Sequence, residues 1–201
     1  MEEPIEKMLA RQSFQNAWHT DLLGAITADL PYFCFVLWCA PCASYDLRRR
    51  ALYGDMSRYV CCAGHTPCSG YCGESECPEL CLITEVMCCF PFSVHSTRFL
   101  LQDEFNIKTT KCDNCIIAFA IFLRRAACIF RVFAAFVPNL RDASRLLTHL
   151  ANGVYCIVCG CIQTQHKVEL DKRDGKLGQT QAPTVQQMSR FDRAGATISG
   201  V

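Results

Sequence analysis

Cysteine is the residue type that brings chemistry to this chain, since it fills 17 of the 201 positions. Seven candidate metal ligands crowd into one Gly-, Pro- and Ser-rich stretch: Cys61, Cys62, His65, Cys68, Cys72, Cys77 and Cys81. Thiolates and imidazoles two to four residues apart are the ligands of structural zinc sites. A loop of this composition buries little apolar surface, so a bound metal would supply the missing order. The spacing favours a structural metal, with zinc as the first candidate and disulfides or unmodified thiols as alternatives.

Other cysteines lie in pairs of similar spacing elsewhere in the chain. Cys112 and Cys115 are also counted as candidate metal ligands. Cys34, Cys39 and Cys42 lie beside an apolar aromatic stretch, where lipid acylation is a further possibility. The sequence opens with an acidic, mixed segment rather than a secretory signal, and the odd cysteine count excludes complete internal pairing. We therefore expect reduced cysteines that face the cytosol.

A second candidate site is a polar path between two helices. Potential ligands recur at steps of three or four in one segment and so share a helical face: His149, Asn152, Cys156, Cys159, Gln163 and His166. Glu85 lies on a similar stripe of an earlier helix, and burying its carboxylate without a partner would be costly. His95, His149 or an arginine could be that partner. Facing each other, the two stripes could hold or pass a soft cation, and a packing seam of small residues is the alternative.

The elements that position these residues are expected to be helices. Helical or apolar patterns cover residues 18–53, 79–105, 116–137 and 142–166, and Pro91 should end or kink the second of these. The sequence predicts a mainly α fold, a small bundle of about four helices with a cysteine-rich irregular loop and no substantial sheet. We divide it into three parts: a polar N-terminal arm (1–17), a cysteine-rich helical domain (18–170) and a flexible polar tail (171–201).

The apolar segment 116–137 has the length of a membrane span, about 20 residues. It contains Arg124, Arg125 and Arg131. Three unpaired arginines at the bilayer centre would cost roughly 7–10 kcal/mol, against roughly 4–7 kcal/mol returned by the Leu, Ile, Val and Phe side chains. We therefore expect a helix that lies in the membrane interface, with a buried helix of a soluble bundle as the alternative. The arginines at 48–50 follow an apolar run, which favours binding to an anionic cytoplasmic leaflet. The alternative is that they form an ordinary solvated helix end.

The composition argues against several classes of function. With 20 basic and 19 acidic residues the net charge is only +1, so no nucleic-acid binding driven by charge is expected. The sequence contains no phosphate loop, dinucleotide fingerprint or Gly-x-Ser-x-Gly elbow, so the chain is not expected to be an enzyme.

Four stretches of the sequence resemble one known family. They are FCFVLWCAPC, YVCCAGHTPCSGYCGESECPELC, RFLLQDEFNIKTTKCDNCI and YCIVCGCIQTQHKVELDKRDGK. Together they look like a plant member of the placenta-specific-gene-eight family of cysteine-rich proteins, of the cadmium-resistance and cell-number-regulator type. The family signature is matched by Cys34, Cys39, Pro41 and Cys42, whereas Phe33 replaces one signature cysteine and Ala40 is an insertion.

The resemblance implies a function at membranes, commonly the plasma membrane, in metal tolerance or growth control. We expect a membrane-associated protein with cytosolic cysteines whose thiolates bind soft metal ions such as zinc or cadmium. Two alternatives stay open: a non-enzymatic interaction scaffold with a structural zinc loop, and a subunit of a homo-oligomeric ion pore. The expected partners are membrane lipids, with further copies of the chain in the pore alternative.

Overall fold

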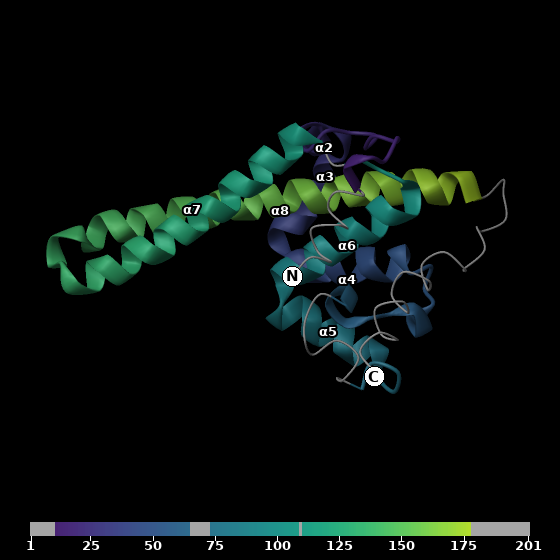
Figure 1. Ribbon diagram of the computed structural model, residues 1–201, viewed down its shortest axis with the longest axis horizontal. Helices are drawn as coiled ribbons and strands as arrows, with labels where there is room; N and C mark the ends of the chain where they lie inside the picture. Colours follow the sequence, from purple (N-terminus) through teal and green to yellow (C-terminus); the bar gives the residue numbers. More distant parts are fainter. Residues whose placement is uncertain (1–10, 65–72, 109, 178–201) are drawn as a thin grey trace.

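The computed structural model describes residues 11–64, 73–108 and 110–177, and it confirms a mainly α fold (Figure 1). Its α-helices are α2 (Gly24–Ala28), α3 (Leu30–Trp38), α4 (Ala40–Ala51), α5 (Pro78–Cys88), α6 (Phe90–Phe105), α7 (Lys111–Phe136) and α8 (Arg141–Leu177). Short 3₁₀ turns are η1 (Met56–Arg58), η2 (Cys61–Gly64) and η3 (Pro138–Leu140). Within these ranges extended pairing is limited to one isolated bridge, between Asn16 and Ile107.

Proline decides where several helices begin. The first turns of α3, α4, α5 and α6 each contain a proline, where its missing N–H costs no helical hydrogen bond. The break expected at Pro91 is confirmed, because α5 and α6 meet at Cys89 with a bend of 117°. A similar break at Cys39 separates α3 from α4. These breaks explain why the structure has more helices than the four segments expected.

The helices form a body and a long projection (Figure 1). In the body, α2, α3, α4 and α6 pack around the C-terminal half of α8, and α5 packs on α4 and α6. The N-terminal half of α8 leaves the body together with α7, and the two run antiparallel as a hairpin that closes at η3. The cysteines of η2 and α5 therefore lie in the body, whereas the apolar segment 116–137 lies in the projection.

Small side chains at seven-residue intervals set the register of the α7–α8 hairpin. The buried residues of this seam are Ala120, Ala127 and Ala134 on α7, and Ser144, Ala151 and Val158 on α8. A repeat of seven keeps one face of each helix toward its partner. A hydrogen bond of 3.3 Å between Gln165 and Asp113 fixes the offset at the body end. Stepping by seven from this pair brings Ala120 to Val158 and Ala127 to Ala151.

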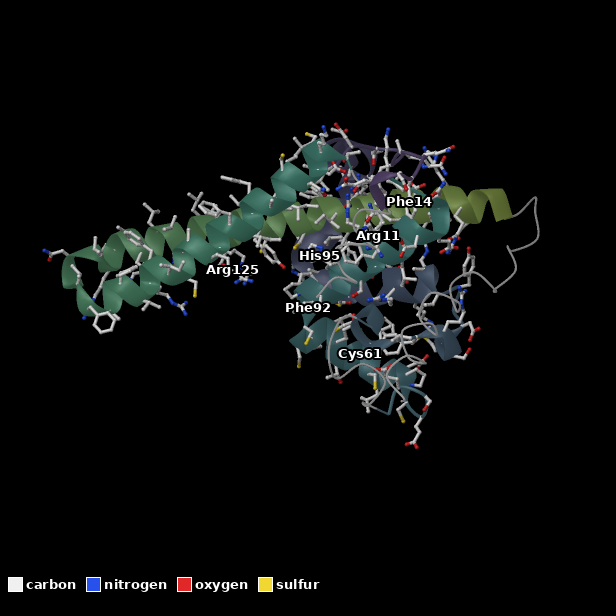
Figure 2. All side chains as sticks on the ribbon, in the orientation of Figure 1. Arg11, Phe14, Cys61, Phe92, His95 and Arg125 are labelled. Carbon is white, nitrogen blue, oxygen red and sulfur yellow. A yellow bond between two sulfur atoms is a disulfide. The ribbon has the colours of Figure 1, made fainter. Side chains whose placement is uncertain are left out.

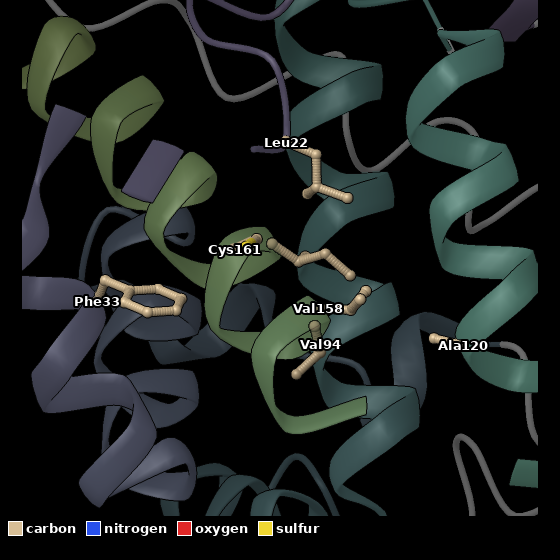
Figure 3. Close-up of a cluster of buried hydrophobic side chains, with 7 residues drawn as sticks. Leu22, Phe33, Val94, Ala120, Val158 and Cys161 are labelled. Atoms are coloured by element: carbon tan, nitrogen blue, oxygen red, sulfur yellow. The ribbon is translucent and has the colours of Figure 1, made fainter. Parts of the chain in front are cut away.

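The main hydrophobic core lies where α8 passes between α3 and α6 (Figure 3). Its buried members are Leu22, Phe33, Val94, Ala120, Val158, Cys161 and Ile162. Gly160 lets α3 approach α8 closely, because a Cβ at this position would lie 2.8 Å from the Phe33 ring. Among the described residues, this core anchors the hairpin to the body at the end opposite η3.

The helical domain is longer than the sequence suggested at both ends. Arg11, within the expected arm, forms a bidentate ion pair with Asp103 at 2.7 Å. At the other end α8 continues past residue 170, and Arg50 contacts Asp171 and Asp174 at 2.7 Å each. Ion pairs to the body therefore hold described residues on both flanks of the expected domain 18–170. Residues 1–10 and 178–201 of the arm and the tail lie outside the described residues.

Candidate functional site

A buried ion pair forms the centre of the cysteine-bearing part of the body. Glu85 on α5 accepts a hydrogen bond of 2.9 Å from the Arg48 guanidinium on α4. Its second carboxylate oxygen accepts from the Tyr59 hydroxyl at 2.7 Å and from the Cys62 backbone N–H at 2.8 Å. The Arg48 and Glu85 side chains are only 1% and 0% exposed. Three donors therefore hold a carboxylate that water does not reach, as a buried charge requires.

The partner of Glu85 is thus an arginine, one of the expected alternatives, and neither His95 nor His149 takes that role. Glu85 belongs to α5, which packs on α4 and α6 rather than on α8. His149 lies on the hairpin and lines a groove near its tip. The facing stripes proposed for a polar path are therefore not brought together. The reason is the register of α8, whose exposed N-terminal half carries His149 away from the body.

The other members of the expected path are split between two environments. Cys156 is exposed on the hairpin, whereas Cys159 and His166 are buried where α8 enters the body. The His166 ring stacks on Trp18 with 5.8 Å between ring centroids. Burial, with the nearby Arg98 guanidinium as the second cause, holds the pKa of His166 well below its usual range. This histidine is therefore uncharged at neutral pH.

Two thiols lie against the buried ion pair. The sulfur atoms of Cys61 and Cys62 and a carboxylate oxygen of Glu85 all lie within 4.8 Å of one another. Burial raises the pKa of Cys61 to about 12, and a metal would have to displace that proton. The Arg48 guanidinium would also compete with a cation for Glu85. The arrangement can donate two soft ligands, while its carboxylate is already engaged.

The remaining expected ligands of the loop are only partly placed. Cys77 is exposed at the N-cap of α5. Cys81, one turn further, packs with Cys61 against a small core that contains Leu82. Cys112 and Cys115 are exposed at the start of α7, on the side of the body opposite α5 (Figure 1). His65, Cys68 and Cys72 lie outside the described residues.

The signature cysteines differ from the expectation of reduced thiols. Cys39 and Cys42 form a disulfide with 5.4 Å between their Cα atoms. Cys34 is exposed on α3, and Pro41 lies in the first turn of α4. An acyl chain on Cys39 or Cys42 would require this disulfide to be reduced first, so Cys34 is the signature cysteine open to acylation in this state.

The hairpin carries its large apolar side chains on the outside. Exposed members between residues 119 and 157 are Phe119, Ile121, Phe122, Ile129, Val132, Phe133, Phe136, Val137, Leu146, Leu150 and Ile157. The exposed fraction reaches 68% for Phe122 and 80% for Phe136. A helix pair stabilised in water buries its large apolar residues and exposes polar ones. Here small residues fill the seam and large ones face outward, the arrangement found where an apolar medium surrounds the helices.

Four of the five arginines of the hairpin follow one of its edges. Arg124 stacks on the Tyr155 ring across the two helices, 4.1 Å from its centroid. Nearer the tip, a groove of about 410 Å³ is lined by Arg131, Arg141 and Arg145, together with Ser144, Thr148 and His149. Residues 116–160 carry five arginines and one aspartate, a formal charge of +4, so the rest of a chain of net charge +1 carries −3. The projection is therefore both apolar and basic. Figure 2 shows that its outer side chains, including Arg125, point away from the seam.

Among the described helices, α8 alone is long and apolar enough to cross a membrane, over Arg141–Gly175. The bent pair of α5 and α6 would pass the same test if it were one span. Core helices of soluble proteins have the same length and hydropathy, and 39% of the apolar stretch of α8 is buried. Sequence reasoning recognised the arginines that disfavour spanning by 116–137. It missed the repeat of small residues at 120, 127 and 134, which is visible in the sequence and predicts a close helical partner.

None of the family models, curated proteins or solved structures compared with the chain matches it.

Proposed function

We propose that this protein docks on membranes through the α7–α8 hairpin. The proposal rests on how the hairpin is packed: alanines fill the seam between its helices, and large apolar side chains lie outside. Contiguous exposed apolar surface marks sites of interaction with proteins or membranes. The acyl region of a bilayer would accept the Phe, Ile and Leu side chains that water disfavours.

The basic edge favours a lipid surface over an apolar protein partner. Arg131, Arg141 and Arg145 line one groove, so phosphate groups of lipids could be bound at the level where the apolar side chains enter the bilayer. Each basic residue near an anionic leaflet contributes roughly 1 kcal/mol. The hairpin then lies in the interface, apolar flank inward and arginines at the headgroups, instead of crossing the bilayer. This orientation keeps Arg124 and Arg131 at the headgroups, whereas Arg125, on the same face as Phe122 and Ile129, would reach the headgroups by extending its side chain.

Vesicle binding by the purified full chain tests the proposal. Changing Phe122, Phe133 and Phe136 to Ser removes exposed apolar surface equal to about two whole Phe side chains. The expected loss is about 3–6 kcal/mol, or at least a hundredfold in partitioning. The matched control changes Leu80 and Met87 on α5, which are 62% and 67% exposed, to Ser.

The expected result is binding that is stronger to phosphatidylserine-containing vesicles than to neutral ones, lost in the phenylalanine variant and kept in the control. Equal loss in both variants would contradict docking through the hairpin. If the chain forms a dimer in detergent-free solution and does not bind vesicles, a second copy of the chain covers the hairpin and membrane docking is contradicted.

A second candidate function is soft-metal binding beside Glu85. It is favoured by the clustering of Cys61 and Cys62 with Glu85 within 4.8 Å, and by the resemblance to cadmium-resistance proteins. At the membrane such a site would affect the handling of zinc or cadmium by the cell. A change in metal handling could in turn affect cell number. Reduced full-length chain should retain zinc or cadmium through dialysis, and changing Cys61 and Cys62 to Ser should lower the bound amount. The control changes the exposed Cys112 and Cys115, and equal metal content in all three proteins would refute the assignment.

A further inference from the structure

The disulfide between Cys39 and Cys42 lies at the start of a helix. Cys39 is the N-cap of the 12-residue helix α4, and Cys42 is in its first turn. Within a helix, Cβ atoms three residues apart are about 5–6 Å from each other. A disulfide needs about 3.5–4.5 Å. Cys39 has non-helical dihedral angles (φ −136°, ψ 69°), which free its side chain to reach Cys42.

A second pair of cysteines shows why the N-cap position of Cys39 matters for the disulfide. Cys112 and Cys115 have the same spacing and are both exposed at the start of a helix. Both lie inside α7, which begins at Lys111, and they are not joined. Spacing alone therefore does not produce the bond. The two pairs differ because Cys39 is an N-cap residue with non-helical dihedral angles, whereas Cys112 lies within its helix.

The environment of the Cys39–Cys42 bond favours exchange with other thiols. Cys42 is exposed and Cys39 half-buried, so an incoming thiolate meets the Cys42 sulfur first. The adjacent Trp38 is 88% exposed, and Pro41 leaves the first turn with one N–H fewer. Within the described residues no side chain caps the N-terminus of α4, so its positive end is open to a thiolate. A Cys39 thiolate released there would be stabilised, and a leaving thiolate of lower pKa leaves faster.

We propose that Cys39 and Cys42 form a dithiol–disulfide exchange site for accessible thiols of the glutathione type. The thiolate of one such molecule attacks the Cys42 sulfur, forms a mixed disulfide and releases the Cys39 thiolate, which takes a proton. A second thiolate attacks the sulfur of the bound molecule and releases Cys42, which is also protonated. Two thiols thereby become one disulfide, and the protein gains two electrons and two protons. The reverse sequence reoxidises the dithiol.

This site is separate from the hairpin and from the Glu85 cluster, so it stands or falls independently of the proposed function. A disulfide that faces the reducing cytosol persists chiefly where it is catalytic or redox-sensing. The bond also spans the break between α3 and α4.

Redox titration of the full chain tests the assignment. The protein is equilibrated over graded ratios of reduced to oxidised glutathione, alkylated, and analysed by mass spectrometry of the peptide between Arg11 and Arg48. Cys39 and Cys42 should gain or lose two hydrogens together within the range that glutathione buffers. Cys112 and Cys115 should stay reduced over the same range.

Two single variants give a second readout. Cys39→Ser should accumulate one glutathione adduct on Cys42, which is exposed in the first turn of α4. Cys42→Ser should form its adduct on Cys39 more slowly, because that sulfur is half-buried. A bond that survives every ratio, thiols that never pair, or titration identical to that of Cys112 and Cys115 would each overturn the proposal.

Discussion

Removing the guanidinium that holds Glu85 should destabilise the protein more than removing any surface charge. Arg48→Met keeps an unbranched apolar stem of similar size but leaves the Glu85 carboxylate buried with only Tyr59 and the Cys62 N–H as donors. Deleting one partner of a buried ion pair costs about 3–5 kcal/mol. For a chain of this length each kcal/mol lowers the Tm by about 2–4 °C, so we expect a decrease of roughly 6–20 °C.

Thermal unfolding followed by circular dichroism measures this decrease. The matched control is Arg145→Met, which breaks an ion pair of 3.5 Å with Asp142 whose partners are 76% and 96% exposed. That pair is worth about 0–1 kcal/mol. Combining Arg48→Met with Glu85→Met should restore much of the lost stability, since apolar replacement of both partners is often neutral. Equal Tm values for Arg48→Met and Arg145→Met would refute the view that the buried Glu85 carboxyl group depends on Arg48.

Three further predictions concern the packing and titration of α8 and its neighbours. In the unfolded chain His166 takes up a proton near pH 6.5, whereas in the folded chain its lowered pKa prevents this. The free energy of unfolding should therefore fall as the pH drops from about 6.5 to 5. Urea unfolding of His166→Gln should show a smaller dependence of this free energy on pH. Ala127→Leu should cost about 1–3 kcal/mol by separating the hairpin helices, whereas Ala118→Leu on the exposed side of α7 should leave the Tm unchanged. Gly160→Ala should also lower the Tm, because its Cβ would meet the Phe33 ring at 2.8 Å.

Local features of the sequence were sufficient to predict the helical class and the break near Pro91. Both depend on periodicity and on the missing N–H of proline, which act within a few residues. The partner of Glu85 could not be predicted, because Arg48 is 37 residues away and only the packing of α4 on α5 selects it from several arginines. The cost of burial did predict that Glu85 needs a partner.

The hairpin shows a different kind of gap between sequence and structure. The conflict between Arg124 and a membrane span was visible in the sequence, and the structure places this arginine on Tyr155 at one edge of the helix pair. Its location follows from the register between α7 and α8, which depends on a tertiary pairing. The disulfide of Cys39 and Cys42 was not expected, because it depends on the helix start falling at residue 40.

The depth of the hairpin tip in a bilayer shows whether the protein docks on membranes through α7 and α8. Two single-site variants, Phe136→Trp on α7 and Leu80→Trp on α5, are compared in a Trp38→Phe background, with buried Trp18 common to both. On vesicles that contain phosphatidylserine and brominated acyl chains, membrane docking through the hairpin predicts blue-shifted, strongly quenched fluorescence for Phe136→Trp and little change for Leu80→Trp. Quenching confined to Leu80→Trp, or absent from both variants, would contradict it.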